Sequence, residues 1–416
     1  MSNNKENPSE KVFSNLCAKQ YLKGFVFHSP KYNDPTEKEA GDIVLWLRTS
    51  LIVFEVFWRD PSLKGSTKNF IKRIGEKRKQ LEADFDAYKS KGSKISLTNE
   101  DGNIINFRQD FFHPDNFVGV IIVDCETDLE KIHYESYKKT LNGKFPICVI
   151  TKKDFVDLLV EIDTVSDLLY YLKDRHDFVK SIFERCPNPF IDLNRRTERD
   201  IVALYKRKGN SFQEYNCNHL SNENIWSSYR NDFSDRIKLR DDENKRTKII
   251  DVLTDYLLKD STNDDLTLEF SWEIGVTTRR QRVYIAEKIE GAFQGLKNGI
   301  ETRQFAFLNP TTGCWSVFYF ENGNDSGLFK DNISEMTRLK LFKEIRENSF
   351  EHSIFGYGFF KSSKSHEDDL YSEIGLWVED AHNYQYPIPE EDYTKALKYF
   401  GKPDSLKIEE FPENKI

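Results

Sequence analysis

The sequence predicts an α/β domain, built as a mixed sheet flanked by helices, followed by an α+β domain. Two observations predict the first domain: apolar runs of strand length within 41–60, 117–125 and 145–151, and amphipathic helical stretches placed among them. A third observation divides the chain, because Pro187-Asn188-Pro189 ends this pattern and a new run of helices follows. We therefore expect domains at residues 1–187 and 190–416.

Composition restricts the class of protein. The chain has 416 residues, of which 38% are hydrophobic and 31% charged, as in a soluble globular protein. Its net charge of −8 argues against a protein coated in nucleic acid, though not against local binding. No apolar stretch approaches the roughly 20 residues that span a bilayer, so we expect no membrane partner.

Targeting signals and cysteine usage favour the cytoplasm. The N-terminal residues MSNNKENPSEK are polar and include no apolar signal segment. The six cysteines stand singly, without CxxC spacing or nearby histidines, so the sequence predicts neither a zinc site nor a disulfide framework. This usage suits a reducing compartment, and we expect a cytoplasmic protein.

The stretch GDIVLWLRTSLIVFEVFWRD, residues 41–60, predicts a buried β-hairpin that carries two acids. A turn at Thr49-Ser50 would place Glu55 near Leu45, with Asp42 a few residues further along. Both carboxylates would then line one end of the hairpin, and such oxygen ligands suit Mg²⁺ or Mn²⁺. The alternative is that Asp42 and Glu55 face water at strand ends or form buried ion pairs.

Strand alternation assigns the side chains of the second strand to two faces. Glu55, Phe57 and Arg59 would point one way, and Phe54, Val56 and Trp58 the other. Arg59 would therefore lie on the same face as the acid.

The elements that follow complete the first domain. Residues 66–88 predict an amphipathic helix, Asp101-Gly102 predicts a hairpin within 95–112, and FVGVIIVDC (117–125) predicts a buried strand. FPICVIT (145–151) predicts another strand. Two helices should follow, opening at the capping residues Thr151 and Thr164.

The order of these elements resembles the core of the PD-(D/E)XK, or restriction-endonuclease-like, nuclease superfamily. That core is a helix carrying an acid, a strand, a strand opening with Asp, a strand bearing Glu-x-Lys, and a helix. Residues 9–27 match the first helix, with Glu10, and the first strand, while Asp42 and Glu55 match the two motif acids. The resemblance implies a Mg²⁺ or Mn²⁺ site formed by Glu10, Asp42 and Glu55, and hydrolysis of DNA or, less favoured, RNA.

The chain departs from the family at one decisive position, because Phe57 stands where the family has its lysine. That lysine is thought to orient the attacking water and to stabilise charge on the phosphate. The sequence offers several cations within reach of the position of that lysine. They are Arg59, which we expect to be catalytic together with Asp42 and Glu55, and also Arg48, Lys72 and Arg73.

The helix after the hairpin is basic. Residues 62–91 hold nine Lys or Arg against four acids, and Phe70, Ile74, Leu81, Phe85 and Tyr88 form its apolar stripe. We expect Lys68, Lys72, Arg73 and Lys79 to contact a nucleic-acid backbone. The alternative is an ordinary solvated helix face.

The second half predicts helices at 198–208, 224–239 and 246–259, and then a helix–strand-pair pattern that occurs twice. The predicted helices are 277–297 and 333–347, and the predicted strand pairs are 303–309 with 314–321 and 353–361 with 373–379. The cluster TTRRQR (277–282) opens one helix. Its arginines suggest either binding of an anion or, as the simpler interpretation, ion pairs with surface acids.

Functions of three classes remain open at this stage. The first is a metal-dependent endonuclease whose second domain senses a trigger or recruits a protein partner, an organisation that resembles bacterial antiphage defence effectors. The second is a degenerate relative that binds nucleic acid or a partner subunit, which Phe57 favours. The third is an interaction protein with no nucleic-acid role, which the net charge of −8 favours.

Overall fold

The structure is a computed structural model of the chain. It describes the following residues: 17, 23–33, 37–58, 67–99, 102, 104–124, 138–162, 164–186, 197–207, 209–212, 225–260, 265–362, 371–384 and 388–401. Among these residues, no helix is long and apolar enough to cross a membrane.

The chain forms two compact units, and the division between them falls inside a helix. Unit 1 runs to Asp242, and unit 2 begins at Glu243. The division lies within α9 (Ser234–Asp260). The predicted boundary at Pro187–Pro189 lies outside the described residues, and the independent folding of two parts stays a prediction.

Unit 1 is built on a mixed sheet of eight described strands, in the order β6-β5-β1-β3-β4-β7-β8, with β2 also paired to β1. Neighbours are antiparallel except β4–β7 and β7–β8, which are parallel. The strands are β1 (Val26–Asn33), β2 (Glu37–Glu39), β3 (Ile43–Leu47), β4 (Ser50–Trp58), β5 (Ser96–Asn99), β6 (Ile104–Asn106), β7 (Phe117–Asp124) and β8 (Ile147–Thr151).

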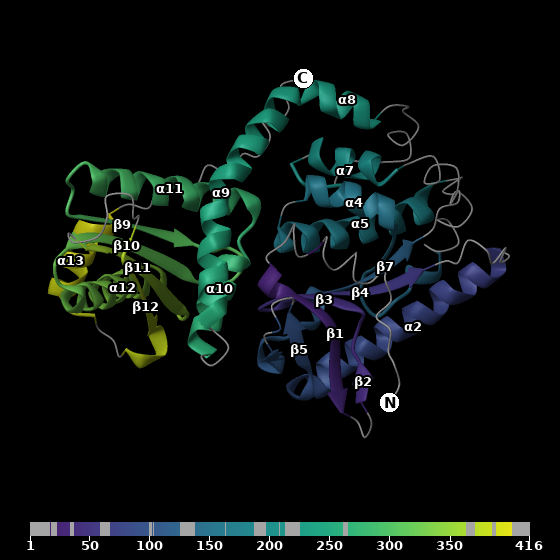
Figure 1. The fold of residues 1–416 in the computed structure, drawn as a ribbon, viewed down its shortest axis with the longest axis horizontal. Helices are drawn as coiled ribbons and strands as arrows, with labels where there is room; N and C mark the ends of the chain where they lie inside the picture. The colour runs from purple at the N-terminus through teal and green to yellow at the C-terminus, as the bar shows by residue number, and fades with distance from the viewer. Residues whose placement is uncertain are drawn as a thin grey trace. The chain divides into compact units, whose positions relative to one another are not determined.

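Helices cover both faces of this sheet (Figure 1). α2 (Thr67–Lys91) lies on one face, where Phe57 of β4 packs on Phe70 with ring centres 5.5 Å apart. α4 (Lys152–Glu161) lies on the other, where Phe54 meets Phe155 edge-on at 5.5 Å. The predicted alternation of side chains is therefore confirmed for Phe54, Glu55 and Phe57, and Glu55 shares the α2 face with Phe57. The predicted side of Arg59 lies outside the described residues.

The helices that follow β8 begin at the predicted caps. The Thr151 hydroxyl accepts the N–H of Asp154 at the start of α4, and Thr164 does the same for Asp167 at the start of α5 (Val165–Arg185). Short 3₁₀ turns connect other elements: η1 (Lys23–Phe25), η2 (Gly92–Lys94), η3 (Gln109–Phe111) and η4 (Pro114–Asn116).

Two buried ion pairs attach the residues beyond the predicted boundary to unit 1. Arg175 of α5 binds Glu198 of α7 (Glu198–Arg207) through two N···O contacts of 2.6 and 2.8 Å. Arg240 of α9 binds Glu161 at 2.6 Å. α8 (Ile225–Asp232) packs against α7. Residues from α7 to the first turns of α9 thus belong with the first sheet.

Cys186, which ends α5, is disulfide-bonded. The expectation that the single cysteines form no disulfide is therefore wrong for this residue. Spacing gave no indication of it, because a bridge depends on which distant segments the fold brings together. Cys17, Cys148 and Cys314 are buried and not disulfide-bonded.

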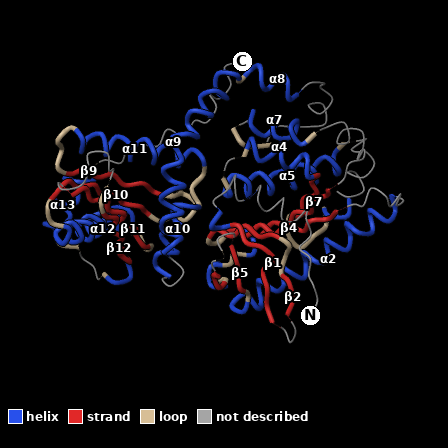
Figure 2. Tube along the Cα trace, in the orientation of Figure 1, coloured by secondary structure: helices blue, strands red, loops and turns tan. Residues whose placement is uncertain are grey.

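Unit 2 is a four-stranded sheet, in the order β12-β11-β10-β9, with helices on both faces (Figure 2). β10 and β11 are parallel, and the two outer strands pair antiparallel with them. Its elements after α9 are α10 (Asp265–Gly275), α11 (Arg279–Lys297), β9 (Thr302–Leu308), β10 (Trp315–Gly323), α12 (Ser326–Asn348), β11 (Ser353–Ser362), β12 (Glu373–Asp380), η7 (Ala381–Asn383) and α13 (Glu390–Phe400).

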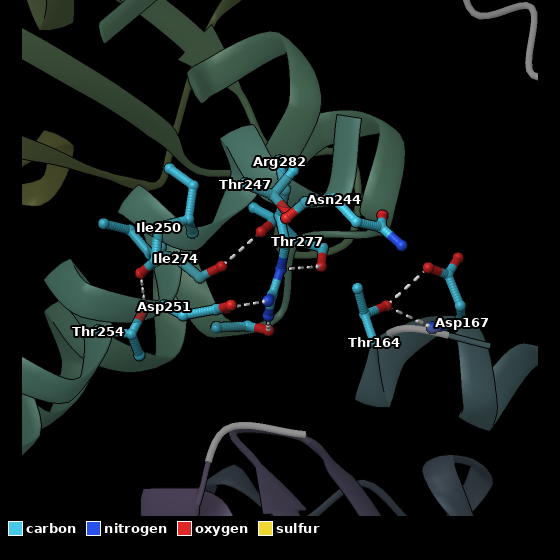
Figure 3. A network of polar contacts seen from close by, with 11 residues as sticks. Thr164, Asp167, Asn244, Thr247, Ile250, Asp251, Thr254, Ile274, Thr277 and Arg282 are labelled. Atoms are coloured by element: carbon cyan, nitrogen blue, oxygen red, sulfur yellow. Dashed lines mark hydrogen bonds and ion pairs between the residues drawn. The ribbon is translucent and has the colours of Figure 1, made fainter. Parts of the chain in front are cut away.

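Two arginines at the start of α11 serve the structure of unit 2, and Figure 3 shows Arg282 among its partners. Arg282 donates to Asp251 Oδ1 at 2.8 Å and to the carbonyl oxygens of Gly275 and Thr277 at 3.1 and 3.3 Å. Arg279 pairs with Glu243 of α9 at 2.5 Å. Of the two interpretations of TTRRQR, the structure supports the ion pairs, because both guanidinium groups are buried and already hydrogen-bonded.

Candidate functional site

Asp42 is held rigidly at the start of β3. Its main-chain N–H donates to the Phe54 carbonyl at 3.1 Å, and its own carbonyl accepts the N–H of Ser29 at 2.9 Å. Gly41 precedes it with φ of +104°, and a Cβ at that position would lie 2.5 Å from Val53 Cγ1. Only glycine therefore fits before Asp42. The Asp42 side chain crosses to β4, where Oδ2 accepts the Val56 N–H at 2.6 Å.

Glu55 lies beside Asp42, which corrects the predicted register. β3 and β4 pair Ile43 with Phe54 and Leu45 with Ile52, so Glu55 stands next to Asp42 and not near Leu45. The turn is formed one residue earlier than predicted, with Arg48 in the left-handed conformation at φ 51°. The correction brings the two carboxylates closer together than the sequence predicted. Glu55 is fully buried.

Lys77 brings a positive charge between the two acids. Its Nζ lies 2.6 Å from Glu55 Oε2 and 3.3 Å from Asp42 Oδ2. The lysine comes from the buried face of α2, and its side chain keeps 23% of its surface exposed. Asp42, Glu55 and Lys77 therefore form one ionic cluster, in which strand residues supply the acids and the helix supplies the cation.

Asp84 extends this cluster from the same helix. It lies about two turns beyond Lys77, it is 3% exposed, and it interacts electrostatically with Glu55 and Asp42. A hydrogen bond between the Glu55 and Asp84 carboxyls needs a proton on one of them. With both ionised, Glu55 Oε1 and Asp84 Oδ2 have no hydrogen-bond partner among the described residues. Tyr88, one turn further, anchors α2 by donating to the Ala40 carbonyl at 3.0 Å.

Burial and like charge shift the protonation of this cluster. Burial raises the pKa of Glu55 well above its usual range, and the Asp42 charge adds to this rise while Lys77 opposes it. Burial also raises the pKa of Asp84 to about 7. Burial alone would lower the pKa of Lys77, but Glu55 and Asp42 raise it overall. Lys77 is therefore a permanent cation at neutral pH.

The structure brings only some of the predicted site residues together. Asp42 and Glu55 meet, whereas Glu10 and Arg59 lie outside the described residues. Lys72 and Lys79 are exposed on α2, and Lys72 lies 3.7 Å from Glu76. The α2 backbone includes Lys68, whose side chain is not described.

Among the cations considered as replacements for the family lysine, Arg73 lies nearest to the site. Its guanidinium carbon is 5.4 Å from the centre of the Phe57 ring, one helical turn from Lys77. Arg48 lies at the turn of the hairpin, at the opposite end from the acids, with its guanidinium over Phe111 at 5.9 Å. Lys72 points away from the cluster because five helical residues rotate it by about 140° from Lys77.

Phe57 is part of the core rather than of an open site. The residue is 6% exposed, packed between Phe70 and the guanidinium of Arg73. A phenyl ring at this position therefore holds α2 against β4. This contact helps to set the position of α2 on β4, from which Lys77 reaches Asp42 and Glu55.

The carboxylates of Asp42 and Glu55 suit a divalent cation, but the described residues supply only part of its coordination shell. Among the described residues, no group of three or more Asp, Glu, His or Cys side chains is placed to hold a metal ion. Two carboxylates completed by water and substrate phosphate are an ordinary Mg²⁺ set, however. The unpartnered, buried Glu55 Oε1 fits a cation ligand, because an ionised oxygen without a donor is costly to bury.

Sequence reasoning missed Lys77 and Asp84, although the sequence holds a signal for both. The predicted apolar stripe of α2 runs through Ile74, Leu81 and Tyr88, all of which are buried. Lys77 and Asp84 occupy the positions that continue this stripe at spacings of three and four. Charged residues on the buried face of a helix need partners, and here the partners are the acids of the hairpin.

Comparison with known proteins gives no assignment. No family model matches the chain, and neither the curated proteins nor the solved structures contain a match. The function must therefore be inferred from the site itself: two adjacent carboxylates, a lysine between them, and a third carboxylate behind.

Proposed function

We propose that this protein is a metal-dependent nuclease that hydrolyses DNA phosphodiester bonds, with Asp42, Glu55 and Lys77 at its centre. One observation carries the proposal: Lys77 Nζ lies 2.6 Å from Glu55 and 3.3 Å from Asp42. Phe57 leaves the strand without the lysine of the PD-(D/E)XK pattern. α2 supplies an ammonium group to the same two acids from a different position in the chain.

The order of elements supports a restriction-endonuclease-like core. The strand β1 is followed by Asp42 and β3, by β4 with Glu55, and then by the long helix α2. After the β5–β6 hairpin, β7 returns parallel to β4. The first helix of the resemblance, with Glu10, lies outside the described residues, so this part of the likeness stays a prediction.

Each residue has a distinct chemical role in this proposal. Asp42 and Glu55, with Glu10 as the third acid implied by the resemblance, would hold the divalent cation. A bound Mg²⁺ or Mn²⁺ supplies Lewis-acid polarisation of the phosphate and lowers the pKa of a bound water. Lys77 stabilises negative charge on the phosphate and opposes the rise in the pKa of Glu55 that burial causes. Arg73, exposed beside Phe57, offers a guanidinium to the adjacent backbone phosphate.

Substitution of Lys77 tests the proposal most directly. Purified protein should nick supercoiled plasmid with Mg²⁺ or Mn²⁺, and Glu55→Gln should abolish the nicking. Lys77→Met should lower the rate by about 10²–10³-fold, the usual effect of removing one preorganised charge. The control is Lys89→Met, which removes an exposed lysine of the same helix and should leave the rate near that of the parent.

Two results would contradict this proposal in different ways. Equal rates for the parent and Lys77→Met would remove Lys77 from the mechanism while leaving the nuclease assignment intact. Absence of nicking by the parent across metals, on double- and single-stranded DNA and on RNA, would reject hydrolysis altogether.

A second candidate function is a catalytically degenerate relative that binds nucleic acid or a protein partner. The observation that favours it is the burial of Glu55, whose Oε2 is already paired with Lys77. In that case the cluster joins α2 to the sheet, and the exposed Lys72, Arg73 and Lys79 bind phosphates. A gel shift whose affinity falls steeply with salt, together with absence of nicking, supports this alternative.

A further inference from the structure

We infer that Asp84 is a ligand of the divalent cation, joining Glu55 from the buried face of α2. The inference rests on the proposed function, because it adds a residue to the same site. Neither the hairpin acids nor the resemblance includes Asp84, which lies on the helix and outside the motif.

The available oxygen atoms point to these two residues. Asp42 Oδ2 is used by the Val56 N–H at 2.6 Å and by Lys77 at 3.3 Å, and Glu55 Oε2 is used by Lys77 at 2.6 Å. Two carboxylate oxygens of the cluster stay without a hydrogen-bond donor among the described residues, Glu55 Oε1 and Asp84 Oδ2. Both belong to side chains that are at least 97% buried, at 0% and 3% exposure.

Glu55 and Asp84 are buried and lie within hydrogen-bonding reach of one another, so their two carboxylates would repel one another and lack hydration if both were ionised. Either a shared proton or a cation removes this penalty. A hard divalent cation is bound by oxygen ligands, and one or two protein carboxylates are enough for Mg²⁺. Lys77, on the other side of Glu55, then remains in place and is free to face the phosphate.

Cation binding by variants of α2 tests the inference without any activity measurement. The full-length parent should bind Mn²⁺ in calorimetry and in electron paramagnetic resonance titration, and Mn²⁺ should raise its unfolding temperature. Asp84→Asn should weaken Mn²⁺ binding at least ten-fold and lose most of the Mn²⁺-dependent rise. In EDTA it should unfold at the same or a higher temperature, because the amide removes like-charge repulsion.

A matched control is present on the same helix. Asp86 is exposed and pairs with Lys144 at 2.9 Å, so Asp86→Asn should bind Mn²⁺ as the parent does. Binding of Mn²⁺ by Asp84→Asn with the parent's affinity would overturn the inference and leave the proposed nuclease standing. Absence of Mn²⁺ and Mg²⁺ binding by the parent would overturn both.

Affinity cleavage of the unmutated protein gives an independent answer if Asp84→Asn fails to fold. Fe²⁺ bound in place of Mg²⁺, with ascorbate and peroxide, generates radicals that cut the backbone beside the ion. Mass spectrometry should place cuts near Glu55 in β4 and near Asp84 in α2. Cuts near Glu55 and absent from α2 around Asp84 would overturn the inference.

Discussion

At the scale of single residues, the sequence identified two acids of the site but missed its lysine. Asp42 and Glu55 stood out because carboxylates interrupt an apolar hairpin, and the structure places them side by side. Their register was predicted wrongly because Arg48 adopts a left-handed φ of 51°, a conformation that sequence patterns assign to Gly or Asn. Lys77 did not stand out in the sequence because the stretch 62–91 holds eight other basic residues.

His176 on α5 gives a pH dependence that one substitution isolates. Burial lowers the pKa of His176, although its Nδ1 lies 3.3 Å from the Ile147 carbonyl, which favours the charged form. The nearby charges of Asp177, Arg175 and Lys180 modify this shift. The unfolded chain, with a histidine pKa near 6.5, therefore binds the proton more readily than the folded chain.

We expect the contribution of His176 to stability to be fully present above about pH 6.5 and to fall as the pH decreases below it. The slope cannot exceed about 1.4 kcal/mol per pH unit for one proton. Urea unfolding of the parent and of His176→Gln at pH 7.5, 6.5 and 5.5 measures this contribution as their difference. A difference that stays constant between pH 7.5 and 5.5 would show that His176 titrates alike in both states.

At the level of elements, the sequence predicted helices and strands well and their long-range partners poorly. α2, α4, α5, β7 and β8 begin and end close to the predicted residues because caps and apolar periodicity are local signals. The attachment of α7 to α5 depends on Glu198 meeting Arg175, 23 residues earlier. No local pattern identifies such a pair, because glutamate and arginine also occur on the exposed faces of many helices.

Two neighbouring residues of α7 allow a matched test of buried and exposed ion pairs. Glu198 and Arg175 are 3% and 1% exposed in their side chains, and Tyr171 also donates to Glu198. Glu198→Gln should therefore lower the free energy of unfolding by about 3–5 kcal/mol, because the Arg175 charge stays buried without its partner. Arg199, the next residue, is 48% exposed and pairs with Asp157, so Asp157→Asn should cost about 1 kcal/mol or less. Urea unfolding curves that give equal losses for both variants would contradict this assignment.

For the whole molecule, the α/β and α+β arrangement was predicted from the order of strands and helices. The sequence did not predict that the first compact unit extends to Asp242. Pro187 and Pro189 predict a break from the sequence alone and lie outside the described residues, whereas the ion pairs of Arg175 and Glu161 accompany a compact unit that runs to Asp242. A proline signals where a helix ends, whereas a domain ends where tertiary contacts stop.

Truncation distinguishes the two boundaries. A chain of residues 1–187 lacks Glu198 and Arg240, so it buries Arg175 and Glu161 without partners, and we expect it to be insoluble or to unfold without cooperativity. A chain of residues 1–242 retains both ion pairs and should show a single cooperative thermal transition by circular dichroism. Cooperative unfolding of residues 1–187 at the same temperature as residues 1–242 would restore the boundary at the prolines.

The ion pair between Glu161 and Arg240 forms only after a delay during synthesis of the chain. The two residues are 79 positions apart, so a ribosome that adds about 5–20 residues per second makes Arg240 about 4–16 s after Glu161. Throughout that interval, every described strand of the first sheet has been translated, while the Glu161 carboxylate has no Arg240 to pair with. The nascent chain is therefore exposed to chaperones and proteases for seconds longer than its sheet alone would require.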